Sequence, residues 1–223
     1  MVRFDTDRVV EAIDPDETAL VIVDMINEFV AEGAAFETPS ARAMVPVLAD
    51  LIDVSRDAGV EVVYLRQVNR PDGSDAGPLA NVTPGITTGE AHNDGDQTAI
   101  YEDLTPAPGD HVVEKHQYDG FFRTELDNIL RNAGVSTVTL AGVASHICCD
   151  STMRGAFFRG YDVIVLEDCN ATFPLPDQGW GEVDEETVNQ VWFSTVASNF
   201  GDVLTADQFT DEIATESRAS TSR

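Results

Sequence analysis

The sequence predicts an α/β fold in which a doubly wound, mainly parallel sheet of about six strands carries helices on both faces, a Rossmann-like three-layer arrangement. Short apolar runs alternate with amphipathic segments along the chain, which is the pattern of strands joined by crossover helices. The runs are nearly continuous in apolar residues, as in strands that are buried on both faces. A chain of 223 residues, 43% hydrophobic and 24% charged, is long enough to bury one large core.

The first half of the chain contains three expected strands and one expected helix. The run at 19–24 (ALVIVD) is apolar and ends in an acid, which is typical of a buried parallel strand. A helix is expected over 39–58, with a proline at its start and a glycine after its end. Further strands are expected at 60–66 and 111–115. Residues 67–98 between them are rich in Gly, Pro, Asn and Asp without periodicity, and we expect a functional loop or lid there.

The second half continues the alternation of amphipathic and apolar segments. The expected elements are, in order, helix 121–132, strand 135–142, helix 147–159, strand 161–168, helix 184–199 and a short strand near Val203. Because no internal repeat or linker interrupts the chain, residues 1–210 are expected to form a single domain. The polar residues 211–223 are expected to form a flexible tail.

The charge of the chain is far from balanced. Forty Asp and Glu residues oppose 13 Lys and Arg residues, for a net charge of −27. Such a field repels phosphate backbones and anionic lipid headgroups, so neither nucleic acid nor a membrane is an expected partner. The apolar fraction is too high for a disordered acidic chain. A folded domain with a carboxylate-rich surface fits a protein from a halophile, where salt screens the repulsion.

The termini and the cysteines indicate where the protein works. Cys148, Cys149 and Cys169 are odd in number, which does not suit a disulfide framework and indicates a reducing compartment. The N-terminal sequence MVRFDTDRVV lacks the apolar core of a signal peptide, and no apolar run has membrane-spanning length. The expected location is therefore the cytoplasm.

Three chemically distinct side chains follow three of the expected strands. Asp24 ends the first strand, Lys115 ends the third, and Cys148 opens the helix after the fourth. Ligands of such sheets bind at the carboxyl ends of the strands, so these side chains are expected to lie at one edge. A helix N-terminus favours a thiolate, a carboxylate accepts the thiol proton, and an ammonium offsets the repulsion between them. The pattern indicates nucleophilic catalysis.

Each of these side chains also has a structural interpretation. Asp24 is consistent with a loop hydrogen bond, Lys115 with a solvated surface charge, and Cys148 with a buried apolar residue. Lys115, however, is the only lysine in a chain with 12 arginines, which favours a position that needs a compact ammonium. Cys149 and Cys169 are expected in the core or behind the site.

The four histidines do not indicate a metal site. His92, His111, His116 and His146 show no paired ligand spacing, and no glycine-rich phosphate loop is present. We therefore expect no metal ion and no cofactor. His116 and His146 lie near the expected site, and His146 is a candidate for the substrate pocket.

Three separated segments resemble motifs of the isochorismatase-like cysteine hydrolases. They are VDMINEF at 23–29, VEKHQYDGF at 113–121 and GVASHICCDST at 142–152, and the resemblance extends in order over about residues 17–205. It implies an Asp24–Lys115–Cys148 triad and a cis peptide between Val143 and Ala144. It also implies oxyanion donors in the backbone N–H groups of Ala144 and Cys148, and assembly into a homodimer or homotetramer.

The resemblance also indicates which reaction of the family the protein catalyses. Isochorismatases proper lack the cysteine that this chain carries, and the metal-binding Asp-x-His pattern of nicotinamidases is absent from residues 65–73. The segment 148–152 looks closest to ureide and carbamoyl amidohydrolases, which implies a cysteine amidohydrolase acting on a small amide or ureide through a thioester. The alternatives are a nicotinamidase-type or isochorismatase-type hydrolase and a non-catalytic binding protein on the same fold.

The substrate contacts are predicted from charge and position alone. Arg66 and Arg70 are candidates to hold a substrate carboxylate. The other candidates for the pocket wall are Asn27, Phe29, Tyr118, Phe121 and His146.

Overall fold

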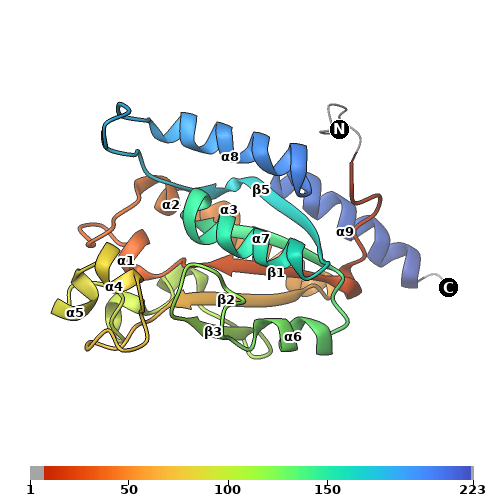
Figure 1. The fold of residues 1–223 in the computed structure, drawn as a ribbon. Helices are drawn as coiled ribbons and strands as arrows, with labels where there is room; N and C mark the ends of the chain where they lie inside the picture. Colours follow the sequence, from red (N-terminus) through yellow and green to blue (C-terminus); the bar gives the residue numbers. More distant parts are fainter. Residues whose placement is uncertain (1–7, 222–223) are drawn as a thin grey trace.

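The computed structural model describes residues 8–221, with side chains as far as residue 214, and is built on a six-stranded sheet (Figure 1). The strand order is β3-β2-β1-β4-β5-β6, and every neighbouring pair is parallel. The strands are β1 Thr18–Val23, β2 Glu61–Gln67, β3 His111–Lys115, β4 Thr137–Val143, β5 Asp162–Ala171 and β6 Asp202–Leu204. The predicted fold class is therefore confirmed.

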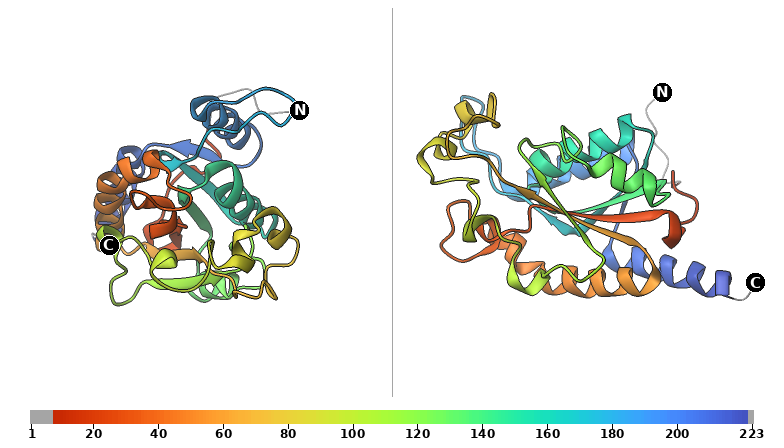
Figure 2. Two further views of the ribbon diagram at one scale, coloured as in Figure 1. Left: turned by 90° about the vertical axis from the view of Figure 1, so that its left-hand side faces the viewer. Right: turned by 90° about the horizontal axis from the view of Figure 1, so that it is seen from below.

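Helices cover both faces of this sheet. They are α1 Asn27–Val30, α2 Pro39–Ala43, α3 Val45–Ala58, α4 Leu79–Val82, α5 Gly85–Thr88, α6 Leu126–Asn132, α7 Asp150–Phe158, α8 Glu185–Asn199 and α9 Ala206–Thr221. Figure 2 shows α3 and α9 on one side of the sheet and α6, α7 and α8 on the other. Within residues 8–221, no helix combines the length and the apolar character that crossing a bilayer requires.

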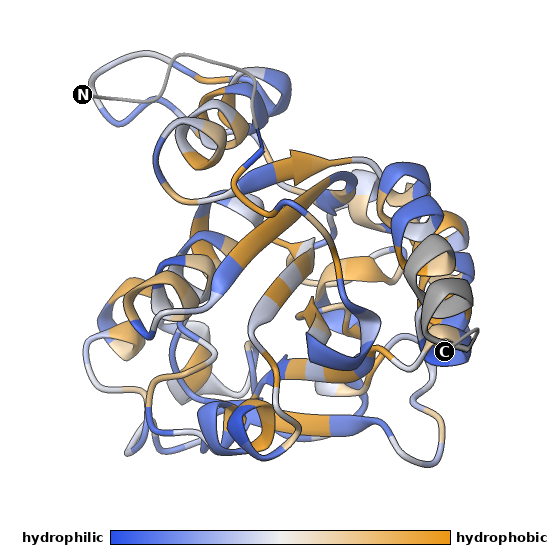
Figure 3. Cartoon of the chain, turned by 90° about the vertical axis from the view of Figure 1, so that its right-hand side faces the viewer, coloured by the Kyte–Doolittle hydropathy of each residue, from blue (hydrophilic) through white to orange (hydrophobic). Residues whose placement is uncertain are grey.

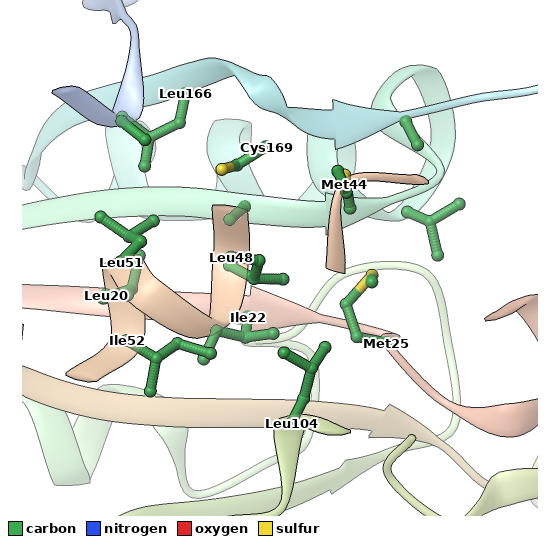
Figure 4. Close-up of a cluster of buried hydrophobic side chains, with 14 of the residues drawn as sticks. Leu20, Ile22, Met25, Met44, Leu48, Leu51, Ile52, Leu104, Leu166 and Cys169 are labelled. Atoms are coloured by element: carbon green, nitrogen blue, oxygen red, sulfur yellow. The ribbon is translucent and has the colours of Figure 1, made fainter. Parts of the chain in front are cut away.

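The two cores arise from the two-residue period of the strands. Leu20 and Ile22 of β1 pack into a cluster with α3 and α9, which Figure 4 shows in part. The alternate residues Ala19, Val21 and Val23 pack into a second cluster with α6, α7 and α8. Since side chains along a strand point alternately to opposite faces, one apolar strand supplies both cores. Figure 3 shows strands that are mostly hydrophobic and helices that mix both kinds of residue.

Two expected helices are shorter or broken, for identifiable reasons. The helix predicted over 39–58 is divided into α2 and α3 at Met44, because Pro46 has no N–H to donate and its ring clashes with the preceding turn. The helix predicted over 121–132 begins only at Leu126. Arg123 has a φ of 58°, a left-handed backbone that an α-helix does not accommodate.

The C-terminal segment contains regular structure. Residues 206–221 form α9, so the segment beyond residue 210 is helical as far as Thr221, and its flexibility stays a prediction. Phe209 and Ile213 are fully buried against the core formed with α3, and this apolar pair stabilises the helix. The part of the expectation that concerns residues 222–223 lies outside the described residues.

The long connection at 67–98 has its own small core. It contains α4, α5 and the 3₁₀ turn Asp96–Thr98, and its buried apolar residues are Ala76, Leu79, Ile86 and Ala91. An isolated bridge between Asn69 and Asn93 ties its two ends together. The connection is therefore folded, and its action as a lid stays a prediction.

The backbone of β1 leaves no room for a side chain at Gly142 of β4. Its φ is +131°, and a Cβ atom there would lie 2.1 Å from the carbonyl oxygen of Val23. We expect Gly142→Ala to lower the free energy of unfolding by about 3 kcal/mol, through overpacking and backbone strain, and the melting temperature by about 10 °C. Thermal unfolding measures this effect.

A second glycine separates the two causes. Gly134 has a φ of +78°, and a Cβ atom there would meet no other atom within 4 Å. Gly134→Ala is therefore expected to cost only about 1 kcal/mol, the backbone term. Equal losses in the two variants would contradict a steric clash between β1 and β4.

Candidate active site

The three predicted side chains meet at the carboxyl edge of the sheet. β1 lies between β2 and β4, and the connections out of these central strands diverge to opposite sides of the sheet. Asp24 directly follows β1, and Cys148 follows β4. Lys115 is the last residue of β3 and pairs in register with Gln67, the last residue of β2. The topological switch point of the sheet therefore positions the site.

Lys115 lies between the acid and the thiol. Its Nζ atom is 2.7 Å from Oδ2 of Asp24 and 3.4 Å from Sγ of Cys148. Nζ also donates to Oε1 of Gln67, at 2.8 Å, and to the carbonyl oxygen of Gln117, at 3.3 Å. Asp24 and Lys115 have no exposed surface and Cys148 is 6% exposed, so a solvated lysine is excluded.

Local backbone geometry places the acid and the thiol. Asp24 has a φ of 51°, which turns the chain out of β1 directly after the strand, and its N–H donates to the carbonyl oxygen of Leu65. Cys148 belongs to a wide π-helical turn, Ser145–Cys149 (η4), that precedes α7. Ser145 donates from Oγ to Oδ1 of Asn189, so the turn is anchored to α8. The implied cis peptide between Val143 and Ala144 is present.

Burial controls the protonation of the thiol. It raises the pKa of Cys148 to about 12, because Lys115 only partly opposes the desolvation and Asp24 adds to it. Burial on its own would lower the pKa of Lys115, but the charges of Asp24 and then Cys148 outweigh it, and the pKa is raised. The expected stabilisation of a thiolate by the helix terminus is therefore wrong for the resting site, which holds a thiol beside an ion pair.

The cluster carries no net charge in this state. Lys115 is positive, Asp24 is negative and Cys148 is neutral. Moving the thiol proton to Asp24 gives a neutral acid, a thiolate and the same ammonium, again without net charge. Because a net charge in an apolar interior is costly, both states suit the buried site. The arrangement therefore allows Cys148 to stay protonated at rest and to lose its proton to Asp24 during attack on a substrate.

The buried thiols make the protein sensitive to alkali. The pKa of Cys169, like that of Cys148, is raised to about 12 by burial. Above about pH 9 the unfolded chain releases these protons while the folded chain retains them, so stability falls as the pH rises from about 9 towards 12. We expect the urea midpoint to decrease between pH 8 and pH 10.5. In Cys169→Ala the decrease is expected to be smaller, and an equal decrease would contradict the buried thiol as a cause.

Cys148 opens onto a small, mostly apolar cavity of about 100 Å³. Its walls come from segments that are far apart in the chain and are formed by Phe29, Phe36, Gln67, Thr83, His92, Tyr118, Ala144, Ile147, Cys148 and Phe173. A volume of this size holds only a few non-hydrogen atoms. The aromatic walls lower the local polarity, which strengthens electrostatic contacts inside the cavity.

Two of the side chains predicted for the pocket, Phe29 and Tyr118, do line this cavity. Burial raises the pKa of Tyr118, and the neighbouring Cys148 raises it further. The predicted oxyanion residues Ala144 and Cys148 also border the cavity. All of these residues either belong to the triad or lie close in the chain to one of its members.

Other predicted pocket residues lie outside the cavity wall. Asn27 donates from Nδ2 to the carbonyl oxygen of Asp96 at 2.8 Å, and Phe121 is buried against Tyr161. His146 bonds to Thr172 through Nδ1, in a different hollow beside α8. Burial lowers the pKa of His146.

Neither candidate arginine borders the cavity beside Cys148. Arg66 is paired with Asp94 and Glu114. Arg70 lines a separate groove of about 850 Å³, together with His116 and Arg123. The two hollows are bordered by consecutive residues at 67–68 and 117–118.

Sequence reasoning missed three polar side chains of the cavity, Gln67, Thr83 and His92. Gln67 ends β2 at the same edge as the triad, so its position at a strand end was a usable signal. His92 pairs with the buried Glu28, with Nδ1 2.8 Å from Oε2, across 64 residues of sequence. No local sequence pattern links His92 to Glu28. Among the described residues, no group of three or more His, Cys, Asp or Glu side chains is arranged to hold a metal ion.

Comparisons with known proteins identify the family of the chain. The isochorismatase domain family matches residues 18–208. Ureidoacrylate amidohydrolase RutB of Agrobacterium fabrum is 32% identical, over 89% of this chain and 95% of that protein. Among solved structures, a cysteine hydrolase from Pseudomonas syringae pv. phaseolicola superposes with a TM-score of 0.91 at 33% identity, over 96% of this chain and all of that one.

A further solved structure has a more specific description. N-carbamoylsarcosine amidase from Thermoplasma acidophilum superposes with a TM-score of 0.67 at 32% identity, over 86% of this chain and 97% of that one. The family match covers most of the chain, including the segments that carry Asp24, Lys115 and Cys148. The chain belongs to the isochorismatase family of hydrolases.

Proposed function

We propose that this protein is a cysteine amidohydrolase that cleaves a C–N bond of a small amide or ureide through a thioester on Cys148. The observation that carries the proposal is the position of Lys115 Nζ, 2.7 Å from Asp24 and 3.4 Å from Cys148 in a buried cluster that opens onto a small cavity. A nucleophile, a base and an ion that holds the base are the parts that covalent acyl transfer needs.

In the proposed mechanism the thiol proton of Cys148 moves to Asp24 and then to the leaving group. Sγ of Cys148 attacks the substrate carbonyl carbon while Asp24 takes the thiol proton, so the buried group stays without net charge. Asp24 then gives this proton to the leaving amine or ammonia as the C–N bond breaks. Water opens the thioester with Asp24 as the base, and the thiol is restored. Lys115 holds Asp24 in place and balances its charge throughout.

The oxyanion has candidate donors in the backbone. Ala144 directly precedes the π-helical turn, Cys148 lies within it, and both border the cavity; we propose that their N–H groups face the developing oxygen. Fixed backbone donors of this kind act when charge develops at the carbonyl oxygen.

The size of the cavity and the named relatives support a small substrate. The space of about 100 Å³ suits the reacting end of a ureide. Relatives of this chain are named for ureidoacrylate and N-carbamoylsarcosine, and both compounds carry a terminal ureide. We propose the same chemical group here, with a protein that acts in the cytoplasm at high salt as a homodimer or homotetramer.

The alternatives make different predictions about the thiol. Isochorismatase-type cleavage of a vinyl ether does not need Cys148, and a nicotinamidase would prefer nicotinamide to ureides. A binding protein without turnover would release no product from any compound. The complete Asp24–Lys115–Cys148 cluster favours catalysis over this last alternative.

A substrate panel tests the proposal. Ammonia release is measured in high salt with ureidoacrylate, N-carbamoylsarcosine, nicotinamide and short primary amides. We expect turnover of at least one ureide or primary amide at a rate above that of nicotinamide. Turnover of nicotinamide alone, or of none of these compounds, would overturn the proposal.

A further inference from the structure

One ring nitrogen of His92, a residue that lines the cavity beside Cys148, has no protein partner among the described residues. Four of the side chains that line this cavity are polar: Gln67, Thr83, His92 and Tyr118. Gln67 accepts from Lys115 at 2.8 Å and donates to Asn69 at 2.7 Å, so both ends of its amide are engaged. Thr83 and Tyr118 share a hydrogen bond. His92 is bonded through Nδ1 alone, and no described residue bonds to its Nε2.

Glu28 holds His92 from behind. The backbone N–H of His92 donates to Oε1 of Glu28 at 2.9 Å and to Oε2 at 3.2 Å, while Nδ1 is 2.8 Å from Oε2. Glu28 is 2% exposed and His92 is 6% exposed. The rings of Phe29 and Phe36 lie 6.0 and 5.4 Å from the imidazole, which leaves the ring little freedom to rotate.

We propose that His92 is a substrate-binding residue whose Nε2 accepts a hydrogen bond from an N–H group of the substrate. The cavity then selects amides and ureides over esters and acids of the same shape. This inference rests on the proposed function and deepens it. The carboxylate of Glu28 only accepts hydrogen bonds, so Nδ1 carries a proton, and in the neutral imidazole Nε2 then has the lone pair that the proposed hydrogen bond uses. An ester oxygen has no proton for that lone pair, so a bound ester makes one hydrogen bond fewer in the cavity than an amide does.

The cavity places this acceptor within reach of the reacting group. His92 and Cys148 line the same space of about 100 Å³, so a ligand that fills it contacts both. The amide N–H groups of a ureide in this cavity would then lie between its apolar wall and the Nε2 acceptor of His92. Selection by one hydrogen-bond acceptor is effective because a ligand without an N–H group leaves that acceptor unused.

Alkylation of Cys148 tests this without requiring turnover. Iodoacetamide carries N–H donors, and methyl iodoacetate has a similar shape without them. In both reactions Sγ forms a bond to the CH₂ carbon, iodide leaves, and Asp24 takes the thiol proton. The rate for each reagent at Cys148 is measured by peptide mass spectrometry and divided by its rate with free cysteine, which gives an amide-to-ester preference.

We expect His92→Phe to reduce this preference about tenfold, the size of one lost buried hydrogen bond. Glu28→Gln tests the same point with less disturbance. The glutamine amide accepts from the backbone N–H of His92 and donates to Nδ1, so the proton moves to Nε2 and the acceptor is lost. The preference is expected to fall in this variant as well, even if His92→Phe does not fold.

His111 provides the matched control. It also pairs with a glutamate, with Nε2 3.1 Å from Oε1 of Glu61, but it lies at the start of β3, away from the cavity. His111→Phe is expected to keep the wild-type preference. An unchanged preference in folded His92→Phe and Glu28→Gln would overturn the role of His92 and leave the proposed function standing. Equal normalised rates for the two reagents at wild-type Cys148 would also overturn the role of His92, whereas the substrate panel tests the proposed function separately.

Discussion

Replacing Cys148 with alanine is expected to reduce hydrolysis of the best ureide or amide substrate about 10³-fold or more, with the fold retained. Sγ is the atom that forms the covalent bond, and neither Asp24 nor Lys115 is able to replace it as a nucleophile because each is held in the ion pair. The measurement is kcat/KM by ammonia release, together with the circular dichroism spectrum of the variant. Loss of a buried thiol of this size is expected to change stability by only about 1 kcal/mol.

Cys169 is the matched control for this substitution. It is a free, fully buried thiol in the core that contains α3, away from the cavity beside Cys148. Cys169→Ala is expected to keep the activity within a factor of about two, because it removes a similar buried volume without touching the cluster. Activity in Cys148→Ala comparable to that in Cys169→Ala would rule out the thioester and favour chemistry that does not use the thiol.

The sequence was sufficient to predict the centre of this site. Asp24, Lys115 and Cys148 each follow or end a strand, and parallel strands necessarily deliver such residues to one edge. The single lysine was informative for the same reason: an acidic chain that otherwise uses arginine retains a lysine where an arginine does not fit. Its complete burial between an acid and a thiol explains that choice.

The periphery of the site was less predictable, because it depends on loops. His92 reaches Glu28 through a connection whose path has no sequence periodicity, and Phe36 and Phe173 lie in segments without regular structure. Arg66 was selected by charge, yet the acidic surface around it offers Asp94 and Glu114 as partners. In a chain with this excess of carboxylates, a partly exposed arginine such as Arg66 forms ion pairs within the protein and is not free to bind a substrate carboxylate.

The protonation of the thiol was also beyond sequence reasoning. A helix start beside a cysteine favours the thiolate only if the thiol is partly solvated. The π-helical turn η4 places Cys148 in the interior, where desolvation dominates and raises its pKa to about 12. The consequence is functional: the base has to act at the moment of attack, so Asp24 and the lysine that holds it matter as much as the nucleophile.

Replacing Lys115 with methionine is expected to remove activity and a large part of the stability together. The variant leaves the carboxylate of Asp24 buried without its counter-ion, which costs about 3–5 kcal/mol of unfolding free energy. The activity is expected to fall about 10³-fold, because an unpaired acid in an apolar site is protonated and no longer accepts the thiol proton. Urea unfolding and kcat/KM measure the two effects on the same sample.

A double variant separates the two effects. Asn is the suitable partner at position 24, because the φ of 51° there is one that Asn tolerates. Asp24→Asn combined with Lys115→Met removes both charges, so stability is expected to return to within about 1–2 kcal/mol of the wild type. Activity is expected to stay as low as in Lys115→Met, since no base remains. Recovery of activity along with stability would show that the ion pair only supports the fold, whereas recovery of stability alone assigns the base to Asp24.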